Sequence, residues 1–171
     1  MDEELPFITI LIATFNEEKN IADCLTSVLS MKYPPEKYEI LVVDGGSTDR
    51  TLEIVKNIQN RTKNNIRIIE CGRGKSLACN IGIKVARGEL IGGLDADDQF
   101  EDPELLSKIA RTYLASERQG DVIMIRGYVS PPVYLLFRCV SSLLNIAKRS
   151  SRNMRVSLLI FIKKYFLSAD S

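Results

Sequence analysis

Apolar residues between positions 7 and 125 fall into two alternating patterns. Short runs rich in Ile, Val and Leu predict buried strands, and longer polar stretches with apolar residues three or four positions apart predict amphipathic helices. The predicted strands cover residues 7–13, 38–43, 66–70, 90–94 and 122–125. The predicted helices cover residues 17–30, 50–60, 76–86 and 103–116.

This order of strands and helices predicts an α/β fold with a doubly wound, mostly parallel sheet and helices on both faces. Ligands of such folds bind beyond the carboxyl ends of the strands. The loops that follow the strands are therefore where functional residues are expected.

The loop after the fourth predicted strand is the most informative, because Asp95-Ala96-Asp97 directly follows the apolar run 90–94. Two carboxylates one residue apart can hold a hard divalent cation that keeps open positions for phosphate oxygens. The pair suggests a site for a nucleoside diphosphate and its metal ion. A single D-x-D is also common in surface turns, so the other loops are needed to decide.

The loops after the other strands are polar as well, and each has a structural alternative. Asp44 precedes two glycines and could accept a hydrogen bond from a nucleobase or a ribose hydroxyl. Residues 72–75 form a cationic turn at a helix start, which suits phosphate but could equally be a solvated turn. Asn16, Ser47 and Asp49 could serve only as helix caps.

Two common nucleotide motifs do not fit. A P-loop would need a glycine where the chain has Ile69, although Gly74-Lys75-Ser76 matches its end. A dinucleotide fingerprint would need glycines in residues 14–20, where there are none. Hydride transfer is therefore not expected.

Four segments taken together resemble the nucleotide-sugar glycosyltransferases of family 2, which have the GT-A fold with its Rossmann-like nucleotide-binding half. They are residues 10–17 (ILIATFNE), 40–51 (ILVVDGGSTDRT), 74–82 (GKSLACNIG) and 94–98 (LDADD). Gln99 after the acidic pair, and residues 126–129, resemble the polyprenyl-phosphate (dolichol-phosphate) sugar synthases within that family.

The resemblance implies a donor that is a UDP- or GDP-sugar, an Mg²⁺ or Mn²⁺ ion, and inverting transfer to a lipid phosphate or a glycan hydroxyl, with polyprenyl phosphate as the favoured acceptor. The implied nucleotide-sugar contacts are Thr14, Phe15, Glu17, Asp44, Lys75, Asn80, Asp95 and Arg126. The implied metal ligands are Asp95, Asp97 and Gln99.

The chain departs from the family pattern at several points. Phe15 replaces the usual tyrosine, and Cys79 stands where an arginine is usual. No catalytic base is identified, because Asp170 is the only carboxylate side chain after Asp121. We therefore expect that the chain lacks the acceptor half. The alternative function is a non-catalytic or truncated nucleotide-sugar-binding module that needs a partner chain. A nucleotidyltransferase is less favoured, since Glu17 follows the first strand where such enzymes have a basic, glycine-rich loop.

Charge divides the chain into a predicted nucleotide-sugar-binding domain, residues 1–129, and a basic tail, residues 130–171. The domain has 16 Lys and Arg against 21 Asp and Glu, whereas the tail has 7 against 1. Apolar-rich stretches at 133–147 and 156–167 predict amphipathic helices that bind a membrane surface or a partner subunit.

Composition adds limits on location and metal chemistry. The N-terminus is acidic and unlike a secretory leader, so we expect a cytoplasmic protein held peripherally on the membrane. The chain has four cysteines without C-x-x-C spacing and no histidine, which indicates reduced thiols rather than a zinc site. A nucleic-acid partner is not expected.

Overall fold

The structure is a computed structural model that describes residues 4–62, 66–72, 74–117 and 159–162. Its strands are β1 (Ile8–Thr14), β2 (Tyr38–Asp44), β3 (Ile66–Glu70), β4 (Leu90–Asp95) and β5 (Leu159–Ile162). Its α-helices are α1 (Ile21–Leu29), α2 (Thr51–Arg61), α3 (Lys75–Val85) and α4 (Leu105–Glu117), and a short 3₁₀ helix covers Pro35–Lys37.

The strands form one sheet in the order β3-β2-β1-β4-β5. β1 pairs in parallel with both β2 and β4, so the chain moves outward from β1 to β3 and then returns to the other side of β1. The point where the winding direction reverses therefore lies between the carboxyl ends of β1 and β4. In parallel α/β sheets, this switch point is where ligands bind.

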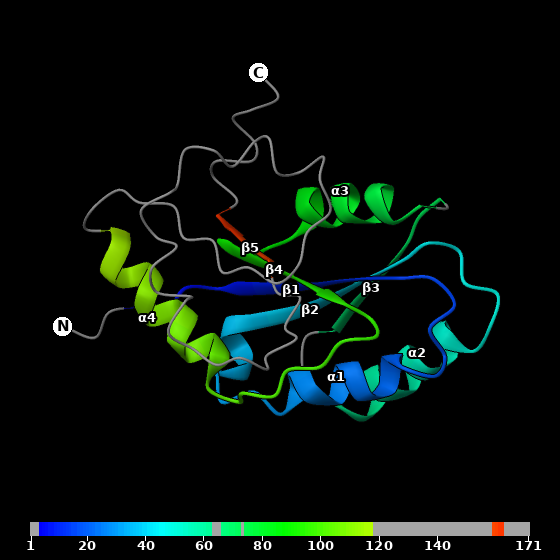
Figure 1. Cartoon of the computed structure of the whole chain (residues 1–171), viewed down its shortest axis with the longest axis horizontal. Helices are drawn as coiled ribbons and strands as arrows, with labels where there is room; N and C mark the ends of the chain where they lie inside the picture. Colours follow the sequence, from blue (N-terminus) through cyan, green and yellow to red (C-terminus); the bar gives the residue numbers. More distant parts are fainter. Residues whose placement is uncertain (1–3, 63–65, 73, 118–158, 163–171) are drawn as a thin grey trace, which may run out of the picture.

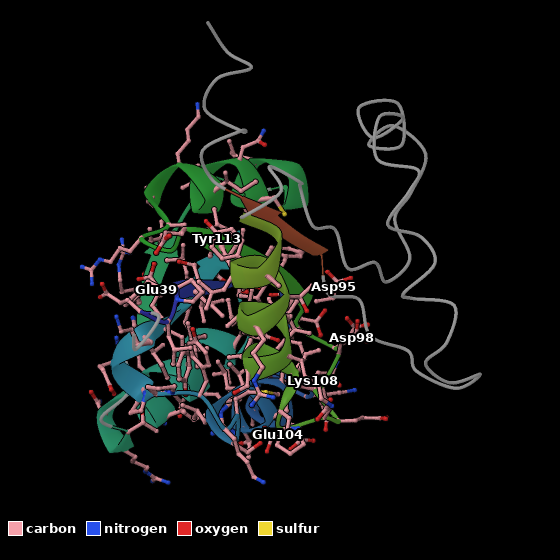
Figure 2. The ribbon with its side chains drawn as sticks, turned by 90° about the vertical axis from the view of Figure 1, so that its left-hand side faces the viewer. Glu39, Asp95, Asp98, Glu104, Lys108 and Tyr113 are labelled. Carbon is pink, nitrogen blue, oxygen red and sulfur yellow. The ribbon has the colours of Figure 1, made fainter. Side chains whose placement is uncertain are left out.

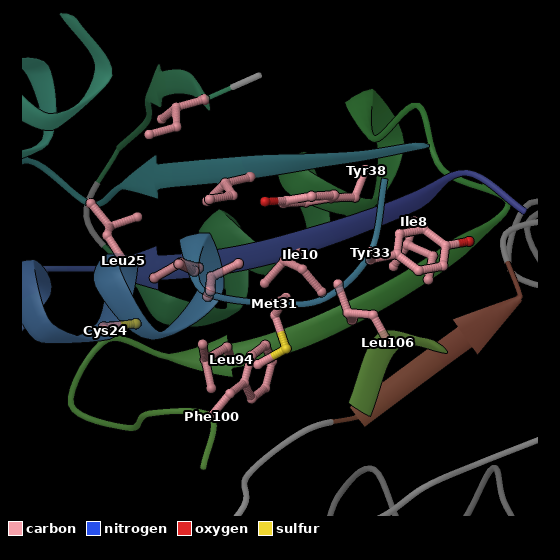
Figure 3. Close-up of a cluster of buried hydrophobic side chains, with 14 of the residues drawn as sticks. Ile8, Ile10, Cys24, Leu25, Met31, Tyr33, Tyr38, Leu94, Phe100 and Leu106 are labelled. Carbon is pink, nitrogen blue, oxygen red and sulfur yellow. The ribbon is translucent and has the colours of Figure 1, made fainter. Parts of the chain in front are cut away.

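Helices cover both faces of the sheet (Figure 1). Ile8, Ile10 and Ile12 of β1 face one core, which receives apolar side chains from α1, α2 and α4. Figure 3 shows part of this core, with Leu94 and Phe100 close to Met31. Leu11 faces the opposite core, together with side chains of α3. The alternation along β1 follows from the two-residue period of a strand.

The first four predicted strands and all four predicted helices are confirmed, with shifted ends. The first helix begins at Ile21 rather than at residue 17, because residues 16–18 bond to the loop after β2 instead. The fourth helix begins at Leu105, two residues after Pro103. The predicted strand at 122–125 and the predicted helix at 133–147 lie outside the described residues.

The prediction of a helix at residues 156–167 is wrong for Leu159–Ile162. These four residues form β5, which pairs antiparallel with β4, Leu90 opposite Ile162. The segment is a run of apolar residues with two isoleucines and a phenylalanine, which favours a strand, and β4 offers it an otherwise open edge. The division of the chain at residue 129 stays a prediction.

A buried charge lies near the amino ends of the strands. Glu39 is completely buried and accepts hydrogen bonds from the hydroxyl of Thr9 (2.8 Å), the backbone N–H of Arg87 (2.7 Å) and the guanidinium of Arg67 (2.9 Å). The hydroxyl of Thr9 in turn accepts the N–H of Gly88 at 2.8 Å. The network joins β1, β2 and β3 to the turn before β4. Among the described residues, no helix has the length and apolar character needed to cross a membrane.

Candidate functional site

A cleft of about 360 Å³ opens at the switch point between β1 and β4. It is lined by Ala13, Thr14, Phe15, Glu17, Gly45, Gly74, Ala78, Asp95, Ala96 and Asp97. The register explains the convergence, since Ala13 pairs with Asp95 and Thr14 with Asp44. The cleft brings together five residues that the sequence suggested, namely Thr14, Phe15, Glu17, Asp95 and Asp97.

The acidic side of the cleft is the segment 95–100, here called the acidic turn. Asp95 is the last residue of β4, and the N–H of Asp98 donates to its carbonyl at 3.0 Å. Asp97 is exposed, and within the described parts of the chain it forms no ion pair with a lysine or arginine. Figure 2 shows Asp95 and Asp98 on the side of the molecule opposite Glu39.

The donor atoms of this turn fit a hard divalent cation. The described residues contain no group of three or more His, Cys, Asp or Glu side chains arranged for a metal. Two carboxylates from Asp95 and Asp97 are nevertheless the kind of partial set that Mg²⁺ uses when phosphate oxygens and water complete its shell. Gln99 is exposed and does not line the cleft.

A thiol lies beneath the acidic turn. Cys24 of α1 is fully buried, and its Sγ donates to the carbonyl of Asp95 at 3.7 Å. Burial, and after it the negative charges of Asp98, Asp97, Asp95 and Glu17, raise the pKa of Cys24 to about 12. The thiol therefore stays protonated at neutral pH.

The loops after β1 and β2 are tied to each other by hydrogen bonds. The N–H of Asn16 donates to the hydroxyl of Ser47 (2.9 Å), and the amide oxygen of Asn16 accepts the N–H of Thr48 (2.8 Å). The N–H of Glu17 donates to the hydroxyl of Thr51 at 2.8 Å. Asn16 reaches these partners with a left-handed φ of 56°. The pairing fixes Phe15, 38% exposed, at the wall of the cleft, where its ring can stack on a flat ligand.

Asp44 is completely buried and shapes the turn that follows it. Its Oδ2 accepts the N–H groups of Gly46 (2.9 Å) and Ser47 (2.8 Å), and its Oδ1 accepts the hydroxyl of Ser47. In this conformation the carboxylate has no surface that a ligand could contact. Its direct contact with a nucleotide stays a prediction.

The helix-cap alternatives have different outcomes. Asp49 lies one position before Arg50, the N-cap residue of α2, and accepts the N–H of Thr51 (3.0 Å), whereas Asn16 bonds to the neighbouring loop. Burial acts to raise the pKa of Asp49, but hydrogen bonds from Thr51 and from the N–H of Glu18 outweigh it, so the pKa lies below its ordinary value.

The other wall of the cleft consists of small residues that sequence reasoning did not place in the site. A Cβ added to Gly45 would lie 3.4 Å from the carbonyl oxygen of Thr14 and 3.8 Å from the backbone nitrogen of Gly74. Ala78 belongs to α3, which begins directly after Gly74. Such residues carry no reactive group. The sequence pointed to this wall only through the glycines in the two loops, and nothing pointed to Ala78.

The remaining predicted contacts are Lys75, Asn80 and Arg126, of which only Asn80 has a described side chain. Lys75 begins α3 next to Gly74, and its side chain lies outside the described part of the structure. Asn80 is exposed on α3 and is not among the lining residues. Arg126 lies outside the described residues. Thr14 is 4% exposed, and within the described structure its buried hydroxyl has no hydrogen-bond partner.

Known proteins resemble this chain in sequence. Glycosyltransferase AglE of Haloferax volcanii is 41% identical over 98 residues, which is 57% of this chain and 32% of that protein. A dolichyl N-acetyl-alpha-D-glucosaminyl phosphate 3-beta-D-2,3-diacetamido-2,3-dideoxy-beta-D-glucuronosyltransferase of Methanococcus voltae is 41% identical over 111 residues, 63% of this chain and 34% of that protein. The chain thus spans about a third of the length of these two relatives.

Solved structures show the same fold. The mannosyltransferase PcManGT of Pyrobaculum calidifontis, in complex with GDP-Man and Mn²⁺, has a TM-score of 0.74 at 22% identity, over 97% of this chain and 47% of that one. TarS 1-349 of S. aureus, in complex with UDP-GlcNAc, has a TM-score of 0.67 at 24% identity, over 96% and 47%. The model of the family described as Glycosyl transferase family 2 matches residues 9–156. The chain therefore belongs to glycosyl transferase family 2.

Proposed function

We propose that this chain binds the nucleotide-sugar donor of a metal-dependent, inverting glycosyltransferase whose favoured acceptor is polyprenyl phosphate. The observation that carries the proposal is the cleft at the switch point. There, the exposed ring of Phe15 and the carboxylates of Asp95 and Asp97 line one cavity. A flat base, a diphosphate and its cation together require these chemical groups.

Each wall of the cleft suits one part of such a donor. Phe15 would stack on the base, with Thr14 and Glu17 beside it. Asp95 and Asp97 would hold Mg²⁺ or Mn²⁺. Gln99, which does not line the cleft in this structure, would have to turn toward it to be a further ligand. When bound, this cation would neutralise the charge that develops on the departing diphosphate. The first backbone N–H groups of α3, next to Gly74, would favour phosphate oxygens through the positive end of the helix dipole.

Two considerations favour a lipid-phosphate acceptor. The name of the Methanococcus voltae relative describes a sugar-bearing dolichyl phosphate. A phosphate acceptor is already anionic and does not strictly need a general base, whereas a sugar hydroxyl does. The named alternative is a glycan, as for the poly-beta-1,6-N-acetyl-D-glucosamine synthase of Staphylococcus epidermidis, 37% identical over 100 residues. With a lipid acceptor, the basic side chains that precede β5 in the sequence, between residues 130 and 158, would hold the protein on the cytoplasmic membrane surface.

Calorimetric titration of the purified chain with UDP-GlcNAc and GDP-mannose, each with Mn²⁺ and with a chelator, tests the proposal. We expect binding that requires Mn²⁺ and that Asp97→Asn abolishes. Asp98→Asn is the matched control, because Asp98 is the neighbouring carboxylate but does not line the cleft. Equal binding by Asp97→Asn and the unmodified chain would refute the assignment of the cation site.

A transfer assay on polyprenyl phosphate then separates the two candidate functions. Transfer by the purified chain supports the complete reaction. Donor binding without transfer would instead support a donor-binding module that needs a partner chain for the acceptor.

A further inference from the structure

We propose that Ser27 of α1 is a positioning residue that sets the divalent-cation affinity of the acidic turn. This inference rests on the proposed function, because it concerns the cation that Asp95 and Asp97 would hold. Ser27 itself does not line the cleft. It would act only through the backbone of the turn.

One turn of α1 holds both ends of the acidic turn. The hydroxyl of Ser27 accepts the N–H of Phe100 at 3.0 Å and donates to the carbonyl of Cys24 at 2.7 Å, so its single O–H is already used within the helix. Three residues earlier in the same helix, the thiol of Cys24 donates to the carbonyl of Asp95 at 3.7 Å. The first and last residues of the turn are thus attached to a single helical turn.

The helix that makes these bonds is firmly seated. Ile21, Cys24, Leu25 and Val28 of α1 are all completely buried. Phe100 is 6% exposed and packs into the same core (Figure 3). The ends of the acidic turn are therefore fixed relative to the sheet by both hydrogen bonds and packing.

The middle of the turn has little support of its own. Its backbone hydrogen bond within the described structure joins the N–H of Asp98 to the carbonyl of Asp95, and Asp97 is exposed. The direction of the Asp97 carboxylate therefore depends on where the two ends are held. Residues that orient metal ligands from behind commonly change metal affinity by ~10–100-fold when they are removed.

Ser30 provides a matched control. Its hydroxyl also donates to a carbonyl three residues earlier, that of Ser27, at 2.8 Å, but among the described residues it forms no hydrogen bond with the acidic turn. Ser27→Ala and Ser30→Ala thus remove the same group and the same kind of helix bond. Ser30 is the exposed C-cap residue of α1, whereas Ser27 is half-buried within the helix and also bonds to Phe100. Ser27→Thr, which keeps the hydroxyl at the same position, therefore serves as the second control.

The test is a titration of the full chain with Mn²⁺ alone, in which electron paramagnetic resonance measures the free ion. Hydrogen exchange of the Phe100 amide is the second readout. We expect Ser27→Ala to weaken Mn²⁺ binding about tenfold and to speed exchange at Phe100. We expect Ser30→Ala to change neither, and Ser27→Thr, which keeps the hydroxyl, to restore both.

The outcomes distinguish this inference from the proposed function. Unchanged Mn²⁺ affinity in Ser27→Ala, with Asp97→Asn still defective, would overturn the positioning role and leave the cation site in place. Absence of Mn²⁺ binding by the unmodified chain would overturn both. If Ser27→Ala does not fold, Cys24→Ala tests the other end of the turn. Weaker Mn²⁺ binding in that variant would support the inference, and unchanged binding would overturn it.

Discussion

Replacing Glu39 by Gln removes the buried negative charge at the amino end of the sheet and keeps the size of the side chain. Glu39 now accepts hydrogen bonds from Thr9, Arg67 and the backbone of Arg87. The amide of glutamine has one acceptor oxygen and a donor group in place of the second oxygen. At least one of the three donors would therefore face another donor.

The cost follows from the burial of these groups. Breaking a buried ion pair by neutralising one partner usually costs ~3–5 kcal/mol. The side chain of Arg67 is 27% exposed, so water can solvate part of its charge after the ion pair is lost, which lowers the cost. We therefore expect the free energy of unfolding to fall by roughly 2–4 kcal/mol. Donor binding should not change in the folded protein, because Glu39 lies at the end of the sheet away from the cleft (Figure 2).

The assay is urea unfolding of the full chain, monitored by circular dichroism. The control is Glu53→Gln, which removes a carboxylate from an exposed pair with Arg50 and should cost no more than ~1 kcal/mol. A Glu39→Gln protein within 1 kcal/mol of the unmodified chain would refute the reasoning, since the buried charge would then carry no net stability.

Four further substitutions test the cleft and the surface. Gly45→Ala should leave the free energy of unfolding within ~1 kcal/mol, because the new Cβ makes only an ordinary 3.4 Å contact, but it should weaken donor binding about tenfold by filling the cleft. Gly46→Ala should instead leave donor binding unchanged and lower the free energy of unfolding, since its φ of 84° costs an L-residue ~1–2 kcal/mol. Calorimetry and thermal melts measure both. Thr14→Val should keep or raise the unfolding free energy by up to ~1 kcal/mol, as it removes a buried hydroxyl that lacks a partner within the described structure, and a clear loss in urea would contradict this. The pKa of Asp102 is lowered by hydrogen bonds from Lys108 and the N–H of Glu104. The stability that this carboxylate contributes is therefore present above its ordinary pKa near 3.8 and is lost as the pH falls through the lower folded value. The difference in urea midpoint between Asp102→Asn and the unmodified chain should be present at pH 6 and shrink below about pH 4.

The sequence predicted the layout of the domain because its signals were local. Apolar runs marked the first four strands, and the acidic pair at the end of β4 pointed to the cleft that the structure contains. The burial of Asp44 was not predictable in this way. It depends on Ser47 and Gly46 folding back onto the carboxylate, which a strand pattern does not reveal.

Errors arose where partners distant in the sequence decide the conformation. The start of α1 moved to Ile21 because Asn16 bonds to Ser47 in the loop after β2 and Glu17 bonds to Thr51 at the start of α2, both more than 30 residues away. β5 depends on the free edge of β4, almost 70 residues earlier in the chain. Neither partner is visible in a window of neighbouring residues, so periodicity alone predicted helix in both places.

The geometry of the cleft is set partly at the opposite end of the sheet. A Cβ on Gly88 would lie 2.5 Å from the backbone nitrogen of Thr9 and 2.6 Å from the carbonyl oxygen of Leu90, so only glycine lets the chain enter β4 this close to β1. That entry fixes a register in which Ala13 lies opposite Asp95. A slip of one residue would turn every side chain of β4 to the other face of the sheet. The acidic pair therefore reaches the cleft only because the glycine at the amino end holds the register.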